Sequence, residues 1–259
     1  MQKRMLLLPI ALLAVSLPIY SQDSFSESDT LSVLPGQGMS LTLSNIVGNI
    51  DVIESGSEEI TLIYTVTCTD RETFEPVEVA FSRDGGVNST VSSMDIRTRN
   101  GNATVDYQLL VPSQTELDIK LQTTEGNVTM NNGSGSALVE ILKGNANIRN
   151  VTGNLSVNVV RGDIELYYCS GLKLVNVIDG NLSGILETLS NNVEISAITG
   201  NIDLTIPDDM QVEVSTVEGT IAVPGVDVRR NFIGSSARFG EGSGTIVISS
   251  YSGNITLAL

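Results

Sequence analysis

The chain contains no histidine and no tryptophan, and only 4% of its residues are aromatic. Without histidine, the sequence excludes catalytic triads, metal centres and acid–base pairs that depend on an imidazole. Without tryptophan and with few other rings, it also offers little surface on which a sugar ring could stack. These absences argue against the familiar classes of hydrolytic enzyme.

Basic residues are scarce as well. The 259 residues include 14 basic and 30 acidic side chains, which gives a formal net charge of −16. A nucleic-acid-binding surface needs clustered Lys and Arg to neutralise phosphates, so the composition excludes nucleic acid as a partner. Hydrophobic residues make up 41% and charged residues 17%, which is typical of a folded domain rather than a disordered tail.

The N-terminus carries the pattern of a secretory signal peptide. Lys3 and Arg4 precede an apolar run over residues 5–15, and small residues follow this run. We predict cleavage between Ser21 and Gln22, so that residues 1–21 form the signal peptide. The mature chain is therefore expected to be secreted, displayed on the cell surface or held in the periplasm.

Two alternatives to this interpretation concern the same segment. Ser16 is a second candidate for the cleavage site, and an uncleaved anchor is disfavoured because the apolar stretch is shorter than the ~20 residues of a spanning helix. Residues 22–34 are rich in serine and acidic residues and are expected to form a flexible polar leader. After signal removal we expect no integral membrane span.

Glycine recurs at a fixed spacing of nine residues. Positions 126, 135, 144, 153, 162, 171 and 180 are all glycine, and the spacing returns between positions 244 and 253. A constant period of this kind is typical of repeat architectures, in which similar units stack on one another.

Most of these glycines begin a short motif. Gly is followed by Asn, Asp or Thr and then by an apolar, a polar and an apolar residue. Alternation with period two predicts a half-buried strand, and Gly-Asn favours a tight turn because both residues tolerate positive φ. The predicted turn residues are Gly48, Asn49, Gly101, Asn102, Gly126, Asn127, Gly144, Asn145, Gly153, Asn154, Gly162, Asp163, Gly180, Asn181, Gly200, Asn201, Gly219, Gly244, Gly253 and Asn254.

Two such units, together about 18–20 residues, are expected to form one coil with two flat faces, because a single strand cannot bury its apolar side alone. We therefore predict an all-β fold, a single-stranded parallel β-solenoid, over residues 35–259. Residues 35–122 are less regular and are interpreted as wider coils of the same solenoid. An antiparallel meander is the alternative, since Gly-Asn turns also make hairpins.

The alternation also predicts which side chains form the core. The pairs expected to point inward are Leu155/Val157, Ile164/Leu166, Val193/Ile195, Ile202/Leu204, Val212/Val214 and Ile221/Val223. Their neighbours Ser156, Glu165, Glu194, Asp203, Glu213 and Ala222 are expected to point outward.

With these repeats behind a secretion signal, the chain resembles the bacterial and archaeal "putative adhesin" family, a β-solenoid domain of unknown function. The resemblance covers roughly residues 35–259. It implies the fold and a role in surface attachment, and it brings no catalytic motif.

The sequence contains no motif that strongly indicates a metal-binding or catalytic site. A calcium-binding β-roll also repeats every nine residues, but it needs aspartate at a position where this chain has asparagine in most repeats and aspartate only at Asp163. We therefore expect no metal and no cofactor, and we interpret the asparagines as turn residues that stack in an amide ladder.

Outward carboxylates could in principle serve a polysaccharide-cleaving enzyme. The candidates are Glu140, Glu165, Asp179, Glu194 and Asp203. We interpret them instead as a solvated acidic face, and Arg229-Arg230 as a small basic spot that balances neighbouring acids.

Cys68 and Cys169 are the only cysteines of the chain. An oxidising compartment would permit a disulfide between them. Separate buried thiols are the favoured interpretation, because the two lie far apart in the sequence and free cysteine is commonly a small core residue.

The sequence thus indicates a non-enzymatic binding protein of the surface or envelope that uses flat solenoid faces for multivalent contacts. Its partner would be a polysaccharide, another envelope protein or a surface. The alternatives are a periplasmic structural or signalling module and, third, a β-helix enzyme acting on polysaccharide. No sequence feature marks the ligand-binding residues.

Overall fold

The structure is a computed structural model, and it describes residues 25–33, 39–68, 80–84, 88–92, 103–113, 115–186, 188–190 and 192–259. Its strands form two large sheets, and no helix occurs in these ranges. The predicted signal peptide with its cleavage site at Ser21 and Gln22, and the predicted turn at Gly101 and Asn102, lie outside the described residues.

Sheet A has 11 strands. In spatial order they are β1 (Phe25–Val33), β4 (Ile60–Cys68), β7 (Ala103–Pro112), β3 (Ile50–Ser55), β9 (Val128–Gly133), β11 (Ala146–Val151), β13 (Ile164–Tyr167), β15 (Leu182–Ile185), β17 (Ile202–Thr205), β23 (Ile255–Ala258) and β19 (Ile221–Ala222).

Sheet B has 12 strands. In spatial order they are β20 (Arg229–Asn231), β21 (Gly234–Phe239), β18 (Met210–Glu218), β22 (Gly244–Ser252), β16 (Val193–Thr199), β14 (Leu172–Asp179), β12 (Leu155–Arg161), β10 (Ala137–Lys143), β8 (Asp118–Glu125), β2 (Ser40–Val47), β6 (Asn88–Ser92) and β5 (Ala80–Asp84).

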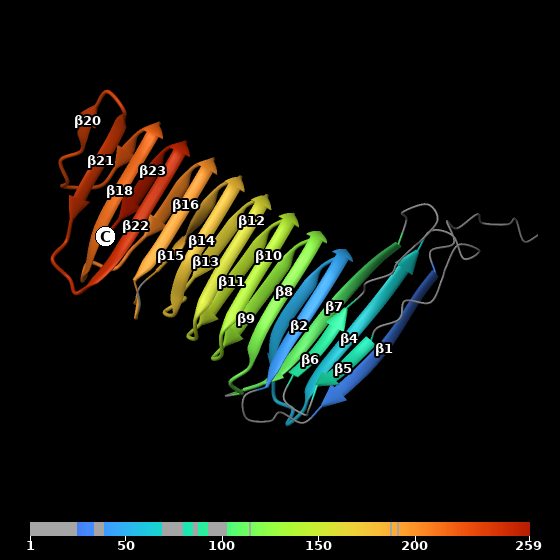
Figure 1. Cartoon of the computed structure of the whole chain (residues 1–259). Helices are drawn as coiled ribbons and strands as arrows, with labels where there is room; N and C mark the ends of the chain where they lie inside the picture. Colours follow the sequence, from blue (N-terminus) through green and yellow to red (C-terminus); the bar gives the residue numbers. More distant parts are fainter. Residues whose placement is uncertain are drawn as a thin grey trace, which may run out of the picture.

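Consecutive strands alternate between the two sheets through the middle of the chain. We call one strand of sheet B together with the following strand of sheet A a coil. Each strand pairs in parallel with its equivalent in the next coil, so that Val139 of β10 lies between Leu121 of β8 and Val157 of β12. The coils stack along one axis, with the blue strands at one end and the red strands at the other (Figure 1). The prediction of an all-β fold with mainly parallel strands is confirmed.

The ends of the stack depart from that regularity. β4 pairs antiparallel with both β1 and β7, β5 with β6, and β21 with both β18 and β20. The interpretation of the first half as wider parallel coils is therefore wrong for β4. Within the predicted flexible leader of residues 22–34, residues 25–33 form an edge strand of sheet A instead. Alternating Ser and Thr on both strands suit such a pairing, with Ser28 Oγ 3.0 Å from Thr65 Oγ1.

Coils that are neighbours in space are not always neighbours in sequence. The coil of β22 and β23 lies between the coil of β16 and β17 and the coil of β18 and β19. At the other end, the coil of β2 and β3 pairs directly with the coil of β8 and β9. The excursion from β4 to β7 therefore extends the stack outward instead of interrupting it (Figure 1).

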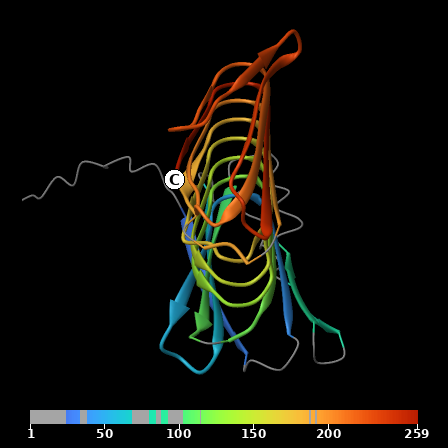
Figure 2. The same cartoon turned by 90° about the vertical axis from the view of Figure 1, so that its left-hand side faces the viewer.

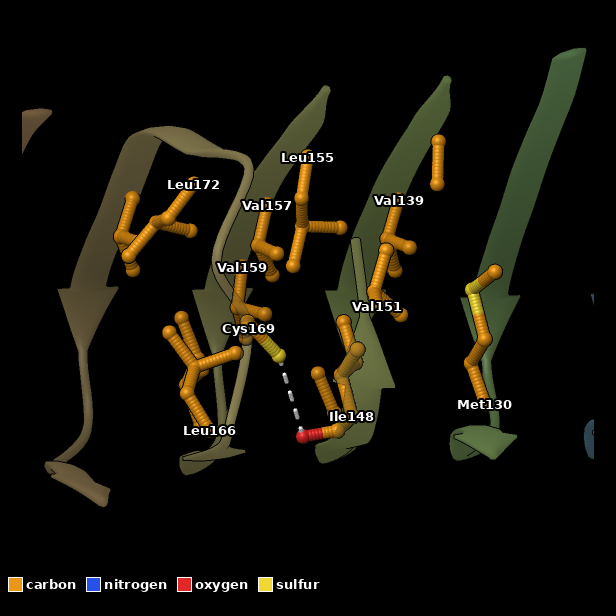
Figure 3. Packing of buried hydrophobic residues seen from close by; sticks show 14 of the residues in the cluster. Met130, Val139, Ile148, Val151, Leu155, Val157, Val159, Leu166, Cys169 and Leu172 are labelled. Carbon is orange, nitrogen blue, oxygen red and sulfur yellow. Dashed lines mark hydrogen bonds between the residues drawn. The ribbon is translucent and has the colours of Figure 1, made fainter. Parts of the chain in front are cut away.

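The core is the space between the two sheets. All twelve side chains predicted to point inward are buried, and none exceeds 9% exposure. Figure 3 shows residues of both sheets interleaving there, among them Val157 from sheet B and Leu166 from sheet A. Each coil contributes the same kind of aliphatic layer, so burial is continuous along the axis.

Cys169 is part of this core. It is a free, buried thiol, and its Sγ lies 3.7 Å from the carbonyl oxygen of Ile148 (Figure 3) and 3.4 Å from that of Tyr167. Desolvation by burial raises the pKa of the Cys169 thiol, and hydrogen bonding to backbone groups opposes this in part. Cys169 forms no disulfide in this structure.

Candidate functional site

The predicted glycines separate into two different turns. Gly48, Gly126, Gly144, Gly162, Gly180, Gly200, Gly253 and Gly219 stack at one corner of the coils, all with φ between 127° and 156°. Gly135, Gly153 and Gly171 stack at another corner and have no positive φ. There each glycine is required because the coils approach closely: a Cβ on Gly153 would lie 1.9 Å from the carbonyl oxygen of Gly135.

The prediction of a positive-φ turn is therefore wrong at Gly153, and φ is not positive at any of the predicted Asn or Asp residues that the structure describes, Asn154 included. Asn154 instead uses its backbone carbonyl, which accepts a hydrogen bond from Ala137 N at 2.7 Å. The prediction of a turn at Gly244 is also wrong, because Gly244 begins β22 and pairs with Met210.

The residues after the first set of glycines form a continuous ladder. Except at the last member, Thr220, the side-chain Oδ1 of each accepts a hydrogen bond of 2.8–3.0 Å from the backbone N–H of the equivalent residue one coil further along. The ladder runs through Asp106, Asn49, Asn127, Asn145, Asp163, Asn181, Asn201, Asn254 and Thr220. These oxygens are occupied by the fold itself, so the ladder holds coils together and is not a ligand site.

The outward carboxylates do not converge. Glu140 and Glu194 lie on the outer face of sheet B, and Glu165 and Asp203 lie on the opposite face of the molecule, in sheet A. Asp179 ends β14 and lies 3.7 Å from Arg161. Within the described ranges, no group of three or more His, Cys, Asp or Glu residues could hold a metal ion. The same ranges contain no helix long and apolar enough to span a membrane.

On the outer face of sheet A, polar groups of β11 and β13 satisfy one another. Asn147 donates to Glu165 at 2.8 Å, and Arg149 donates to Asn147 at 2.9 Å. The guanidinium of Arg149 lies 4.4 Å from the ring centroid of Tyr167 and so covers one face of that ring. This network pairs the polar side chains of β11 and β13 with one another.

The outer face of sheet B is different, because it carries an exposed apolar row. The row consists of Ile46, Leu142, Val160, Ile178, Ile198, Tyr251 and Val217, with Thr124 between the first two, and its apolar members are 39–56% exposed. The strand registers place them side by side on eight adjacent strands from β2 to β18. At ~4.8 Å per strand, the row is about 34 Å long.

A polar row runs beside it, two residues earlier on each strand. Ser44 donates to Gln122 at 3.0 Å, Gln122 donates to Glu140 at 2.7 Å, and Asn176 donates to Asn158 at 2.9 Å. These half-buried groups are ordered by their neighbours, and they still carry lone pairs and N–H groups that face outward. The outer face of sheet B thus carries hydrogen-bonding groups and apolar side chains in two parallel rows.

Exposed ion pairs border the other side of the apolar row. Lys143 lies 3.2 Å from Glu125, and Arg161 lies 3.7 Å from Asp179. A hollow of about 530 Å³ opens on this face, lined in part by Ile46, Leu142, Val160 and Gln122. An apolar strip with a polar border is the usual composition of a protein contact surface.

The sequence did contain a signal for the apolar row. Each of its members stands two positions before a positive-φ glycine: Ile178 before Gly180, and Ile198 before Gly200. Because the alternation predicts only polar side chains on the outer faces, the repeated apolar residue at this position was missed. This apolar residue lies at the end of each strand, just before the glycine, whereas the sequence motif covers only the residues that follow the glycine.

A protein-family model matches the sequence over more than half of its length. It is the model for Toastrack DUF4097, and it matches residues 82–258. The chain belongs to the Toastrack DUF4097 family. This membership confirms the resemblance suggested by the Gly-Asn repeats, and the family is one of unknown function.

Two solved structures are similar to this Toastrack chain. One is a "putative cell adhesion protein" from Clostridium sporogenes, with 14% identity, a TM-score of 0.38, and coverage of 90% of this chain and 99% of the other. The second is a "putative adhesin" from Bacteroides fragilis, with 11% identity, a TM-score of 0.39, and coverage of 89% and 97%. No curated protein matches the chain.

Proposed function

We propose that this chain is an exported, non-enzymatic binding protein of the cell surface or envelope, and that it holds its partner on the outer face of sheet B. The finer description of its core as a single-stranded parallel β-solenoid is part of this proposal. The observation that carries the proposal is the apolar row, because seven half-exposed apolar side chains in register are costly to leave in water.

The geometry of the row supports an extended partner. Equivalent groups recur at each strand, so a polysaccharide, an envelope protein or a surface with repeated groups can make the same weak contact many times. Many weak contacts along one rigid face add up to strong attachment without a closed pocket. Loss of two or three members should therefore weaken attachment far more than the loss of any one of them.

Several observations support a binding role over catalysis. The chain has no histidine to act as a base, and Glu140 accepts a hydrogen bond from Gln122 while Lys120 lies 3.3 Å away. A polysaccharide-cleaving enzyme needs two carboxyl groups facing one bond, whereas the carboxylates of this chain are spread over opposite faces.

The test compares variants of the two faces. Leu142→Ser with Ile178→Ser removes two members of the apolar row, and Ile53→Ser with Ile185→Ser makes the same change on the outer side of sheet A. Each purified protein is incubated with intact cells, with isolated envelope and with a panel of neutral and acidic polysaccharides, and retention is measured. We expect the sheet B variant to lose retention and the sheet A variant to keep it.

Equal retention by all three proteins would contradict the assignment of the face. Release of new reducing or unsaturated ends from any polysaccharide would contradict the absence of catalysis. Protease treatment of intact cells that express a tagged copy checks the location. Cleavage places the chain outside, and protection until the envelope is broken favours the periplasmic structural or signalling role.

A further inference from the structure

The end of the stack formed by the C-terminal coils carries a projecting hairpin. β20 and β21 pair antiparallel at the edge of sheet B, with Asn231 opposite Gly234. The two residues between them, Phe232 and Ile233, form the turn. Figure 2 shows the tip of this hairpin extending beyond the stacked coils.

The composition of this turn is not explained by the fold. Two-residue hairpin turns favour Gly, Asn and Asp, because large apolar residues gain nothing there and are left in water. The turn is held instead by Asn231, whose Oδ1 accepts hydrogen bonds from Ile233 N at 2.9 Å and from Gly234 N at 3.1 Å. Phe232 is fully exposed and Ile233 is 74% exposed, the two highest values among the large apolar side chains that the structure describes.

The base of the hairpin is basic in an otherwise acidic protein. The segment from Arg229 to Arg238 contains three arginines and no acidic residue, whereas the whole chain has a net charge of −16. Arg238 lies 3.1 Å from Glu213, but Arg229 and Arg230 are exposed and have no ion pair with any described residue. The nearest acid in sequence, Asp227, precedes the hairpin and leaves the tip itself free of negative charge.

We propose that this hairpin docks on a lipid bilayer with anionic headgroups. Phe232 and Ile233 enter the boundary between headgroups and acyl chains, and Arg229 and Arg230 bind the phosphates at the level just above. The exposed arginines favour an anionic lipid surface over an apolar protein pocket, which would have to bury or pair them. The acidic remainder of the chain is repelled by the same surface, so the stack stands away from the membrane with sheet B accessible.

The absence of tryptophan provides a direct probe. In Phe232→Trp, the only tryptophan of the chain stands at the tip, and in the matched control Tyr251→Trp it stands in the apolar row of sheet B. Protein recovered after export is mixed with vesicles of phosphatidylglycerol and phosphatidylcholine in equal parts, or of phosphatidylcholine alone. We expect a blue shift, and quenching by lipids brominated in the acyl chain, for the tip tryptophan with the anionic vesicles only.

Partition coefficients from vesicle sedimentation measure the two contributions. Phe232→Ser with Ile233→Ser should lower the partition coefficient at least about tenfold. Arg229→Gln with Arg230→Gln should lower it about fivefold for each arginine and remove the preference for phosphatidylglycerol. Both pairs of residues are exposed, so circular dichroism of the variants should equal that of the wild type.

Failure of the wild type to sediment with anionic vesicles would overturn the proposal, as would unchanged binding by the serine variant. If the tip tryptophan shifts without vesicles, and the serine variant elutes as a smaller species than the wild type, the tip contacts a second copy and the membrane assignment is wrong. Apart from the Tyr251→Trp control, these measurements do not involve the apolar row, so they can fail while the proposed function holds.

Discussion

Replacement of Gly144 by alanine should destabilise the stack strongly. Gly144 stands at the first corner with φ at 142°, a conformation that L side chains rarely adopt. A Cβ at this position would lie 2.0 Å from the carbonyl oxygen of Gly126 in the preceding coil. Ordinary contact begins at 3.4 Å, so the two coils would have to separate locally.

The structure gives the size of the effect. The backbone conformation alone costs about 1–3 kcal/mol for a residue with a side chain. Separation of the coils also strains hydrogen bonds from Gly126 N to Lys143 O and from Asn145 N to Asn127 Oδ1, both 2.9 Å long. At about 1 kcal/mol for each bond, the free energy of unfolding should fall by about 3–5 kcal/mol.

Guanidinium titration followed by far-UV circular dichroism measures this change, and Gly56→Ala is the control. A Cβ on Gly56 meets no heavy atom within 4 Å, so that variant should stay within about 0.5 kcal/mol of the wild type. If Gly144→Ala also stays within that margin, close stacking of the glycine corner does not hold the coils together and the reasoning fails.

Two further predictions concern other parts of the stack. Asn201→Ala removes the oxygen that accepts the N–H of Asn254, so it should lower the free energy of unfolding by about 1 kcal/mol, whereas Asn201→Asp keeps an acceptor and should lose less; equal losses would show that the ladder bond contributes nothing. In a Cys68→Ser background, Cys169 should react with iodoacetamide much more slowly in the folded than in the guanidinium-unfolded chain, because burial both shields it and raises the pKa of its thiol. Because the pKa of the Cys169 thiol is higher in the folded than in the unfolded chain, the free energy of unfolding should fall as the pH rises past the ordinary pKa of cysteine. Fast labelling of Cys169 in native buffer would contradict its burial.

The sequence is sufficient to predict the layers of the fold. Apolar residues at alternate positions after each glycine, such as Ile164 and Leu166, identify the inward side chains because the period of a strand is two. It is not sufficient to predict the order of the coils. The repeats at Gly200, Gly219 and Gly253 are nearly equivalent, so local pattern cannot decide which of them are neighbours.

The sequence also could not separate the two corners or identify the apolar row. A spacing of nine applies equally to Gly144, which needs positive φ, and to Gly153, which needs only the absence of a Cβ. The row consists of single residues such as Ile198, one per coil, and they become a surface only when parallel pairing aligns them. That alignment is a property of the register, which depends on contacts between distant segments.

The position of the coil formed by β22 and β23 has a consequence for the order of events during synthesis. Residues 244–258 are synthesised, and on the proposed export also cross the membrane, after both coils that finally enclose them. Val193 and Val212 both pair with Ile246, one from each side. The length of chain between Val193 and Val212 is close to the length that separates paired residues of consecutive coils elsewhere in the stack. The nascent chain can therefore join β16 directly to β18 in a premature pairing that must open before the last coil enters. Completion of this end should be a slow, late step of folding, separate from the rapid sequential growth of the middle coils.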